Sequence, residues 1–337
     1  MIVALAGGVG GAKLAVGLYR ALPPGELTLV VNTADDAEMF GLHVSPDLDT
    51  ALYTLAGLAN PQTGWGLAGD SFACMAMLER YGAPTWFRLG DGDLATHILR
   101  TDLLRRGRRL TEVAAHLAQR FGVRATLLPM CDEPVATLLE TADGLLDFQE
   151  YFVHRHWDVA VTGVRLRGVE AARPTREVRA TLLAAEALVI CPSNPVVSVG
   201  PILAVPGMAD LLRGLRVPRI AVSPIVGGQA VSGPAGRLMR ALGYEESVHG
   251  VAAFYRGLVD GLVVDEADAG ERARLEASGL RVLVTTTIMR SDGDSRGHSE
   301  LGDDTHRMEY RGASVRAGCR YLRDAGGAWR GGAQRGR

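Results

Sequence analysis

Four glycines and a lysine near the start of the chain could bind phosphate. They are Gly7, Gly8, Gly10, Gly11 and Lys13, and they follow an apolar strand and open a helix. Glycine lets the backbone approach a ligand closely, and a helix N-terminus presents free N–H groups to an anion. The spacing matches neither common nucleotide motif, because Lys13 replaces the third glycine of G-x-G-x-x-G and no Gly-Lys-[Ser/Thr] follows. This glycine loop predicts a phosphate site, and the alternative is a tight turn without a ligand.

Polar and acidic residues after the second apolar strand could bind a divalent cation beside that phosphate. They are Asn32, Thr33, Asp35, Asp36, Asp47 and Asp49. Several carboxylates beside a phosphate would repel it, and Mg²⁺ bound by one or two carboxylates plus phosphate oxygens removes that conflict. We predict Asp36 and Asp49 as the Mg²⁺ ligands and as catalytic residues. Asp47 could instead be a helix N-cap.

Two further segments offer polar groups in the same pattern. Arg88, Asp91, Asp93 and His97 form a second acidic turn that leads into a helix. Asp93 could be an N-cap, and His97 could be an ordinary helix histidine. The residues after a later buried strand could contact phosphate or a base edge, with an Asx-type turn as the alternative; they are Ser193, Asn194, Pro195 and Ser198.

Short apolar runs alternate with amphipathic segments, which predicts an α/β fold with a mostly parallel sheet and helices on both faces. Strands are expected over 2–6, 27–32, 187–191, 219–223, 261–264 and 281–285. Helices are expected over 12–22, 47–57, 71–81, 93–106, 111–121, 176–186, 235–242, 249–258 and 268–278. Residues 123–165 suggest a small β-rich insertion. In such sheets the ligand crevice lies outside the carboxyl ends of the strands, where most of these polar loops would converge.

Composition narrows the class of protein. The chain has 337 residues, 47% of them hydrophobic, and a net charge of −2, so no overall basic field attracts nucleic acid. No run approaches the ~20 apolar residues of a membrane span. The four cysteines are far apart, which is typical of reduced thiols in a cytoplasmic protein. Residues 291–337 are rich in Gly and Arg, lack apolar periodicity and are predicted to be a disordered tail after a domain of residues 1–290.

In their order along the chain, these motifs resemble the 2-phospho-L-lactate transferase family of deazaflavin coenzyme F420 biosynthesis. The matching segments are 7–13, 31–36, 45–50, 89–97, 128–130, 192–202 and 222–228. The resemblance implies a Rossmann-like homodimer that requires Mg²⁺. It also implies transfer of a phospholactyl or phosphoenolpyruvyl group from lactyl- or enolpyruvyl-diphospho-guanosine to the deazaflavin alcohol FO, with release of GMP.

The resemblance also assigns residues to the two substrates. Asp49 and Arg88 look like deazaflavin-site residues, and Asp91, Asp93 and His97 are placed with them. The glycine loop and Ser193-Asn194-Pro195 look like the guanosine-diphosphate side, to which we add Asn32, Thr33 and Ser198.

The chain departs from the family pattern at Gly92, where arginine is usual, and at Thr286, where aspartate is usual. Three other functions remain open: a related nucleotide-sugar-binding regulatory paralogue without transferase activity, a nucleotide-sensing module, and a dehydrogenase.

Overall fold

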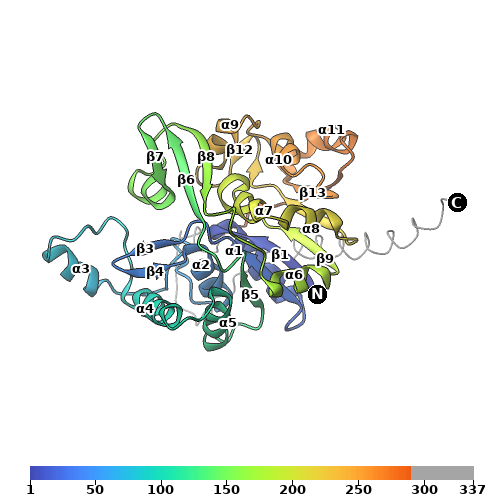
Figure 1. Cartoon of the computed structure of the whole chain (residues 1–337). Coiled ribbons are helices and arrows are strands. Elements are labelled where there is room, and N and C mark those ends of the chain that lie inside the picture. Colours follow the sequence, from blue (N-terminus) through green and yellow to red (C-terminus); the bar gives the residue numbers. More distant parts are fainter. Residues whose placement is uncertain (290–337) are drawn as a thin grey trace, which may run out of the picture.

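A seven-stranded parallel sheet forms the centre of the molecule (Figure 1). The computed structural model describes residues 1–289. The strand order is β14-β13-β10-β9-β1-β2-β5, and every neighbouring pair is parallel. The strands are β1 (Ile2–Ala6), β2 (Leu27–Val31), β5 (Thr126–Pro129), β9 (Ala187–Ile190), β10 (Arg219–Val222), β13 (Gly261–Val264) and β14 (Arg281–Val284). The predicted α/β class is confirmed.

Alternate residues of the strands pack into two separate cores. Ala4 and Ala6 of β1 contribute to one core, together with α1 (Gly8–Ala21), α2 (Pro46–Leu55) and α5 (Leu110–Arg120). Val3 and Leu5 contribute to the other core. The helices of that second core are α6 (Arg176–Leu183), α7 (Gly200–Ala204), α8 (Met208–Gly214), α9 (Ala235–Ala241), α10 (Val248–Phe254) and α11 (Arg272–Ala277). The sheet is therefore covered on both faces, as its continuous apolar strands require.

The small β-rich insertion exists, but its bounds differ from the expected 123–165. It is the antiparallel sheet β7-β6-β8, made of β6 (Ala136–Thr141), β7 (Gly144–Asp147) and β8 (Val161–Arg167), with the helical turn η1 (Glu150–His154). Residues 126–129 instead form β5, the edge strand of the main sheet, paired in parallel with β2. Leu127 and Leu128 explain this placement, because each is buried in a different core.

The helix after the glycine loop begins at Gly8 rather than at residue 12, so the glycine motif is itself the first helical turn. Gly8 has a φ of +62° at this entry, which a side chain would disfavour. The expected helix over 268–278 is divided into η3 (Glu266–Glu271) and α11. Residues 195–214, where no helix was expected, contain η2 (Pro195–Val199), α7 and α8, which are short because Gly and Pro interrupt them.

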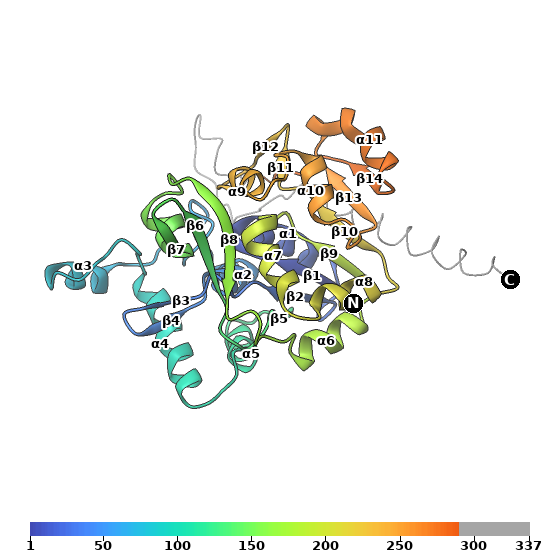
Figure 2. The same ribbon diagram turned by 45° about the horizontal axis from the view of Figure 1, so that its top comes forward.

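An arm of residues 57–90 projects from the body and contains α3 (Ala73–Arg80), as both views show (Figures 1 and 2). The Asp91 carboxylate accepts hydrogen bonds from the N–H groups of Ala73 and Cys74 at the start of α3. Conversely, the Asp70 carboxylate accepts from the N–H groups of Gly92 and Asp93 at the start of α4 (Asp91–Arg105). The two helices therefore cap each other, which fixes the base of the arm.

Two short hairpins complete the described residues: β3 (Ala37–Met39) with β4 (Leu42–Val44), and β11 (Ile225–Val226) with β12 (Gln229–Ala230). Within residues 1–289 no single helix has the length and apolar composition of a membrane span; one pair, Pro195–Ala204 and Met208–Gly214, meets that criterion only jointly and is bent by 86°. The predicted tail over 291–337 lies outside the described residues.

Candidate active site

The glycine loop and the loop after β9 meet at the carboxyl ends of the neighbouring strands β1 and β9. The Gly7 N–H donates to Ser193 Oγ over 3.0 Å. A Cβ at Gly10 would lie 2.6 Å from the Pro192 carbonyl oxygen, and one at Gly11 would lie 2.5 Å from Ser193 Oγ. Glycine is therefore required for this close approach. Because the strand order changes direction between β1 and β9, this contact lies where open α/β sheets bind ligands.

Asp47 already fills part of the anion-binding position at the start of α1. Its Oδ1 accepts from the Gly8 N–H over 2.8 Å, and its Oδ2 accepts from Asn32 Nδ2 over 3.0 Å. Burial raises the pKa of Asp47 to about 6. Asp47 comes from the first turn of α2, but its side chain caps α1 rather than its own helix.

The remaining predicted nucleotide residues surround this contact. Asn32 Nδ2 also donates to the Val197 carbonyl, and Asn194 Oδ1 accepts from the Val196 and Val197 N–H groups at the start of η2. Pro195 is the first residue of η2. Ser198 lies beside Gly7, since its Cβ is 2.7 Å from the position that a Gly7 Cβ would take. Lys13 is half-buried on α1 and makes no ion pair with the residues that the structure describes.

A group of buried side-chain oxygen atoms lies near Asp47, mainly on the residues that follow β2. Asp36 Oδ2 accepts from Ser45 Oγ over 2.8 Å and faces His43 Nε2 over 2.9 Å. Burial raises the pKa of Asp36, and burial together with the Asp47 charge raises the pKa of Asp35 well above its ordinary value. Six buried side-chain oxygens have no hydrogen-bond partner within residues 1–289, and four of them belong to this group: Thr33 Oγ1, Asp35 Oδ1, Asp36 Oδ1 and Thr137 Oγ1. Unpaired carboxylate and hydroxyl oxygens suit a hard cation such as Mg²⁺.

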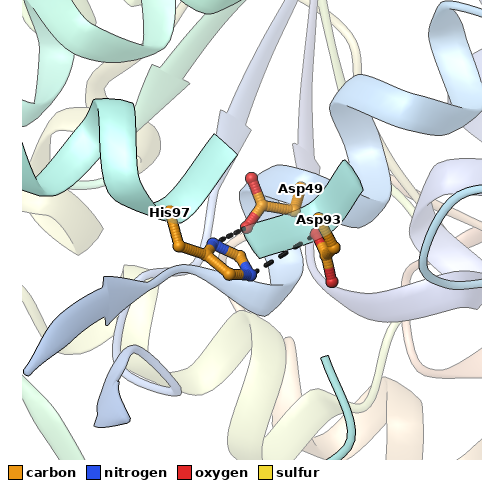
Figure 3. Close-up of side chains that lie close together, drawn as sticks. All are labelled: Asp49, Asp93 and His97. Carbon is orange, nitrogen blue, oxygen red and sulfur yellow. Dashed lines mark ion pairs between the residues drawn. The ribbon is translucent and has the colours of Figure 1, made fainter. Parts of the chain in front are cut away.

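A second buried group combines α2 and α4 (Figure 3). The Asp49 and Asp93 carboxylates are both directed at the His97 ring: Nδ1 is 3.7 Å from Asp49 Oδ2, and Nε2 is 3.4 Å from Asp93 Oδ1. By distance alone these three side chains could hold a metal ion. However, Arg100 donates to both Asp49 oxygens, with 3.0 Å from Nη1 to Oδ2, so a protein cation already neutralises Asp49.

The other predicted deazaflavin residues lie at the base of the arm. The Arg88 guanidinium carbon is 4.7 Å from the centre of the Phe72 ring. Both oxygens of Asp91 accept hydrogen bonds at the start of α3, and the hydrogen bond from Ser71 lowers the pKa of Asp91. Asp91 is thus engaged in capping. Gly92, where arginine is usual in the family, leaves little room for a side chain, because a Cβ there would lie 3.0 Å from Leu67 Cδ1.

Several residues at the site were not found from the sequence. Arg100 is 1% exposed and is the largest fully buried side chain of the described residues. Tyr53 donates to Asp93 Oδ1 over 2.8 Å. His43 joins the two acidic groups, because its ring faces Asp36 and its carbonyl accepts from Arg100. One available signal was the spacing of Asp93, His97 and Arg100, which places all three on one face of α4.

The fold and site define the class as a Rossmann-like α/β protein with buried acidic groups at its strand ends. The chain belongs to the 2-phospho-L-lactate transferase CofD family, whose model matches residues 2–290. It is 43% identical over 300 residues to a 2-phospho-L-lactate transferase of Methanosarcina acetivorans, covering 89% of this chain and 97% of the relative. It is also 43% identical over 295 residues to a phosphoenolpyruvate transferase of Streptomyces griseus, covering 86% and 92%.

A solved structure of a UPF0052-family protein from Bacillus halodurans is similar in fold. Its TM-score is 0.56 at 16% sequence identity, and the match covers 85% of this chain and 92% of that chain. This likeness supports the α/β architecture and says nothing of the reaction.

Proposed function

We propose that the chain transfers a phospholactyl or phosphoenolpyruvyl group from lactyl- or enolpyruvyl-2-diphospho-5'-guanosine to FO, giving (dehydro) coenzyme F420-0 and GMP. The main supporting observation is the direct contact between the glycine loop and Ser193, with the buried Asp47 carboxylate on the neighbouring Gly8 N–H. The names of the relatives support both the phospholactyl and the phosphoenolpyruvyl form of the transferred group. We further propose that the protein is a cytoplasmic homodimer. Light scattering of the purified protein tests the oligomeric state.

In this proposal the two substrates bind to different elements. The guanosine-diphosphate side consists of the glycine loop, Asn32, Thr33 and the loop from Ser193 to Ser198. The deazaflavin side consists of Asp49, Asp93 and His97 with Arg88 and Asp91 at the base of the arm. The arm reaches the nucleotide side as well, since a Cβ at Gly64 would lie 2.6 Å from Val9 in the glycine loop. Both substrates would therefore be bounded by one continuous surface.

We propose Mg²⁺ as the cofactor, held on the nucleotide side by Asp36 with oxygens of Asp35 and Thr33. The fit rests on their unpaired buried oxygens. When bound, Mg²⁺ would neutralise negative charge on the phosphate oxygens. Asp49 is the other expected ligand, and it would share its oxygens with the Arg100 guanidinium, which already bonds both of them.

The chemistry assigned to the chain is positioning and proton handling. The acceptor hydroxyl oxygen forms a bond to the phosphorus that bears the lactyl or enolpyruvyl group, and the bond from that phosphorus to the GMP oxygen breaks. Such transfer needs the two oxygens in line with phosphorus. The hydroxyl proton passes to a carboxylate of the acceptor side, where Asp49 is the proposed group that orients or accepts it. Backbone N–H groups of the glycine loop stabilise charge on the phosphate oxygens.

One experiment separates the candidate functions. The purified protein is incubated with FO, Mg²⁺ and each guanosine donor, and GMP and product are followed by chromatography, with EDTA and Asp49→Asn reactions alongside. We expect GMP and product in equal amounts, and loss of both with EDTA. Donor binding without GMP release would favour a nucleotide-sugar-binding regulatory protein or a nucleotide sensor. In a parallel incubation with an oxidised nicotinamide cofactor, reduction of that cofactor would favour a dehydrogenase.

A further inference from the structure

Arg100 is a guanidinium enclosed by polar groups from three elements. Its Nη1 lies 3.0 Å from Asp49 Oδ2, 3.1 Å from His97 Nδ1 and 3.4 Å from the His43 carbonyl oxygen, and its Nη2 bonds Asp49 Oδ1. Arg100 and His97 are each 1% exposed. These contacts join α2, α4 and β4 in a single buried network.

The chemistry of a guanidinium determines which atom of His97 bears the proton. Arginine has five N–H donors and no acceptor, and it stays charged in proteins. A contact of 3.1 Å between Arg100 Nη1 and His97 Nδ1 is therefore a hydrogen bond only if Nδ1 accepts. A neutral imidazole whose Nδ1 accepts has its proton on Nε2. That Nε2 is buried without a hydrogen-bond partner among the described residues, 3.4 Å from Asp93 Oδ1.

We propose that Arg100 is a positioning residue, which fixes both oxygens of Asp49 and locks His97 in the neutral tautomer with its proton on Nε2. His97 is then a hydrogen-bond donor at this site, toward Asp93 or toward an oxygen of the acceptor, and is not the general base. The consequence for the acceptor rests on the proposed transferase function, whereas the tautomer itself does not.

Imidazole ¹⁵N NMR of the histidine-labelled protein tests the tautomer directly. We expect the His97 signals, assigned by their loss in His97→Gln, to show a protonated Nε2 and an unprotonated Nδ1. In Arg100→Met the lock is removed, and Nδ1, which then faces the unpaired Asp49 carboxylate, should gain a proton. The matched control is Arg106→Met, which removes an exposed arginine at the end of the same helix that pairs with Asp102, and it should leave the His97 signals unchanged. A proton on Nδ1 in the wild type, or an unchanged His97 pattern in Arg100→Met, overturns the proposal.

Removing Arg100 alone leaves Asp49 buried and unpaired, which can prevent folding. The double variant Asp49→Asn/Arg100→Met removes both charges and should fold. Its Nδ1 should lose the ¹⁵N shift of a hydrogen-bonded acceptor seen in the wild type, and an unchanged Nδ1 shift there also overturns the proposal. In the transferase assay, Arg100→Lys should lower kcat at least tenfold and leave the donor KM within about twofold, because the network lies on the acceptor side. An unchanged kcat would overturn the positioning role. If the wild type shows the expected tautomer but transfers nothing, the proposed function fails and the tautomer assignment stands.

Discussion

Replacing Gly10 with alanine would test the close approach between α1 and the loop after β9. The added Cβ would lie 2.6 Å from the Pro192 carbonyl oxygen, whereas carbon–oxygen contacts are normally about 3.3 Å or longer. Helix and loop must therefore separate by about 0.7 Å. The Gly7 N–H to Ser193 Oγ hydrogen bond, 3.0 Å long, spans the same gap and would break.

The expected free energy change follows from three terms. Alanine in place of glycine within a helix stabilises by about 1 kcal/mol. Overpacking costs about 1–3 kcal/mol, and the lost hydrogen bond costs about 1 kcal/mol. The variant should thus be less stable by about 1–3 kcal/mol, which lowers Tm by about 2–4 °C per kcal/mol.

The measurement is thermal and urea denaturation of Gly10→Ala beside Gly214→Ala, with GDP and Mg²⁺ binding by calorimetry. Gly214 is the matched control, because it also lies in a helix but has open space around its Cβ position. We expect Gly214→Ala to stay within about 1 kcal/mol of the wild type and to bind GDP normally. If Gly10→Ala matched Gly214→Ala in both stability and GDP affinity, the close approach would be irrelevant to the site and our reasoning would be refuted.

Three other predictions follow from the site. Asp49→Asn leaves the buried Arg100 guanidinium without its charge partner, so it should lower stability by about 3–5 kcal/mol. In the folded fraction, turnover should fall by roughly 10²-fold or more, and near-normal turnover would remove Asp49 from the mechanism. The folded-state pKa of Asp47 is raised from 3.8 to about 6. Its contribution to the free energy of unfolding is therefore full below pH 3.8 and falls by about 3 kcal/mol as pH rises through about 6. Asp47→Asn should flatten this part of the pH profile in urea titrations, and an unchanged slope would contradict the raised pKa. GDP with Mg²⁺ at ~100 times its Kd should stabilise the protein by about 2.7 kcal/mol and ADP by less, and equal Tm shifts would argue against a guanosine donor.

The sequence could predict the crevice because parallel strands end at one edge of their sheet. Six of the seven strands of the main sheet were expected within one residue of their observed bounds. That prediction was enough to bring Gly7 and Ser193 together from positions 186 residues apart, and the hydrogen bond between them confirms the convergence. The missed strand, β5, lies inside the range expected for the β-rich insertion, and an apolar run alone does not show which sheet it joins.

Side-chain partners could not be predicted in the same way, because they depend on how helices from distant segments pack. Asp47 has the position of an ordinary N-cap of α2, yet its carboxylate caps α1. Asp91 of α4 caps α3, and Asp70, which precedes α3, caps α4, over separations of 18 and 22 residues. Arg100 has the sequence context of an exposed helix arginine, and only the packing of α2 against α4 reveals its pairing with Asp49.

The two acidic groups differ in how their charge is balanced, and this difference bears on where a cation would bind. Asp49 has a guanidinium on both of its oxygens, so its charge is already balanced and Arg100 would repel a second cation there. Burial raises the pKa of Asp35, Asp36 and Asp47, and neighbouring carboxylates raise the pKa of Asp35 and Asp47 further. Within residues 1–289 the three form no ion pair with Lys or Arg. Burial and neighbouring negative charge favour the protonated form of a carboxylate or its binding to a metal ion. An incoming diphosphate adds negative charge at the Gly8 N–H, where Asp47 already lies. This balance favours Mg²⁺ on the nucleotide side, with Asp36, and leaves the Asp49 side to arrange the acceptor.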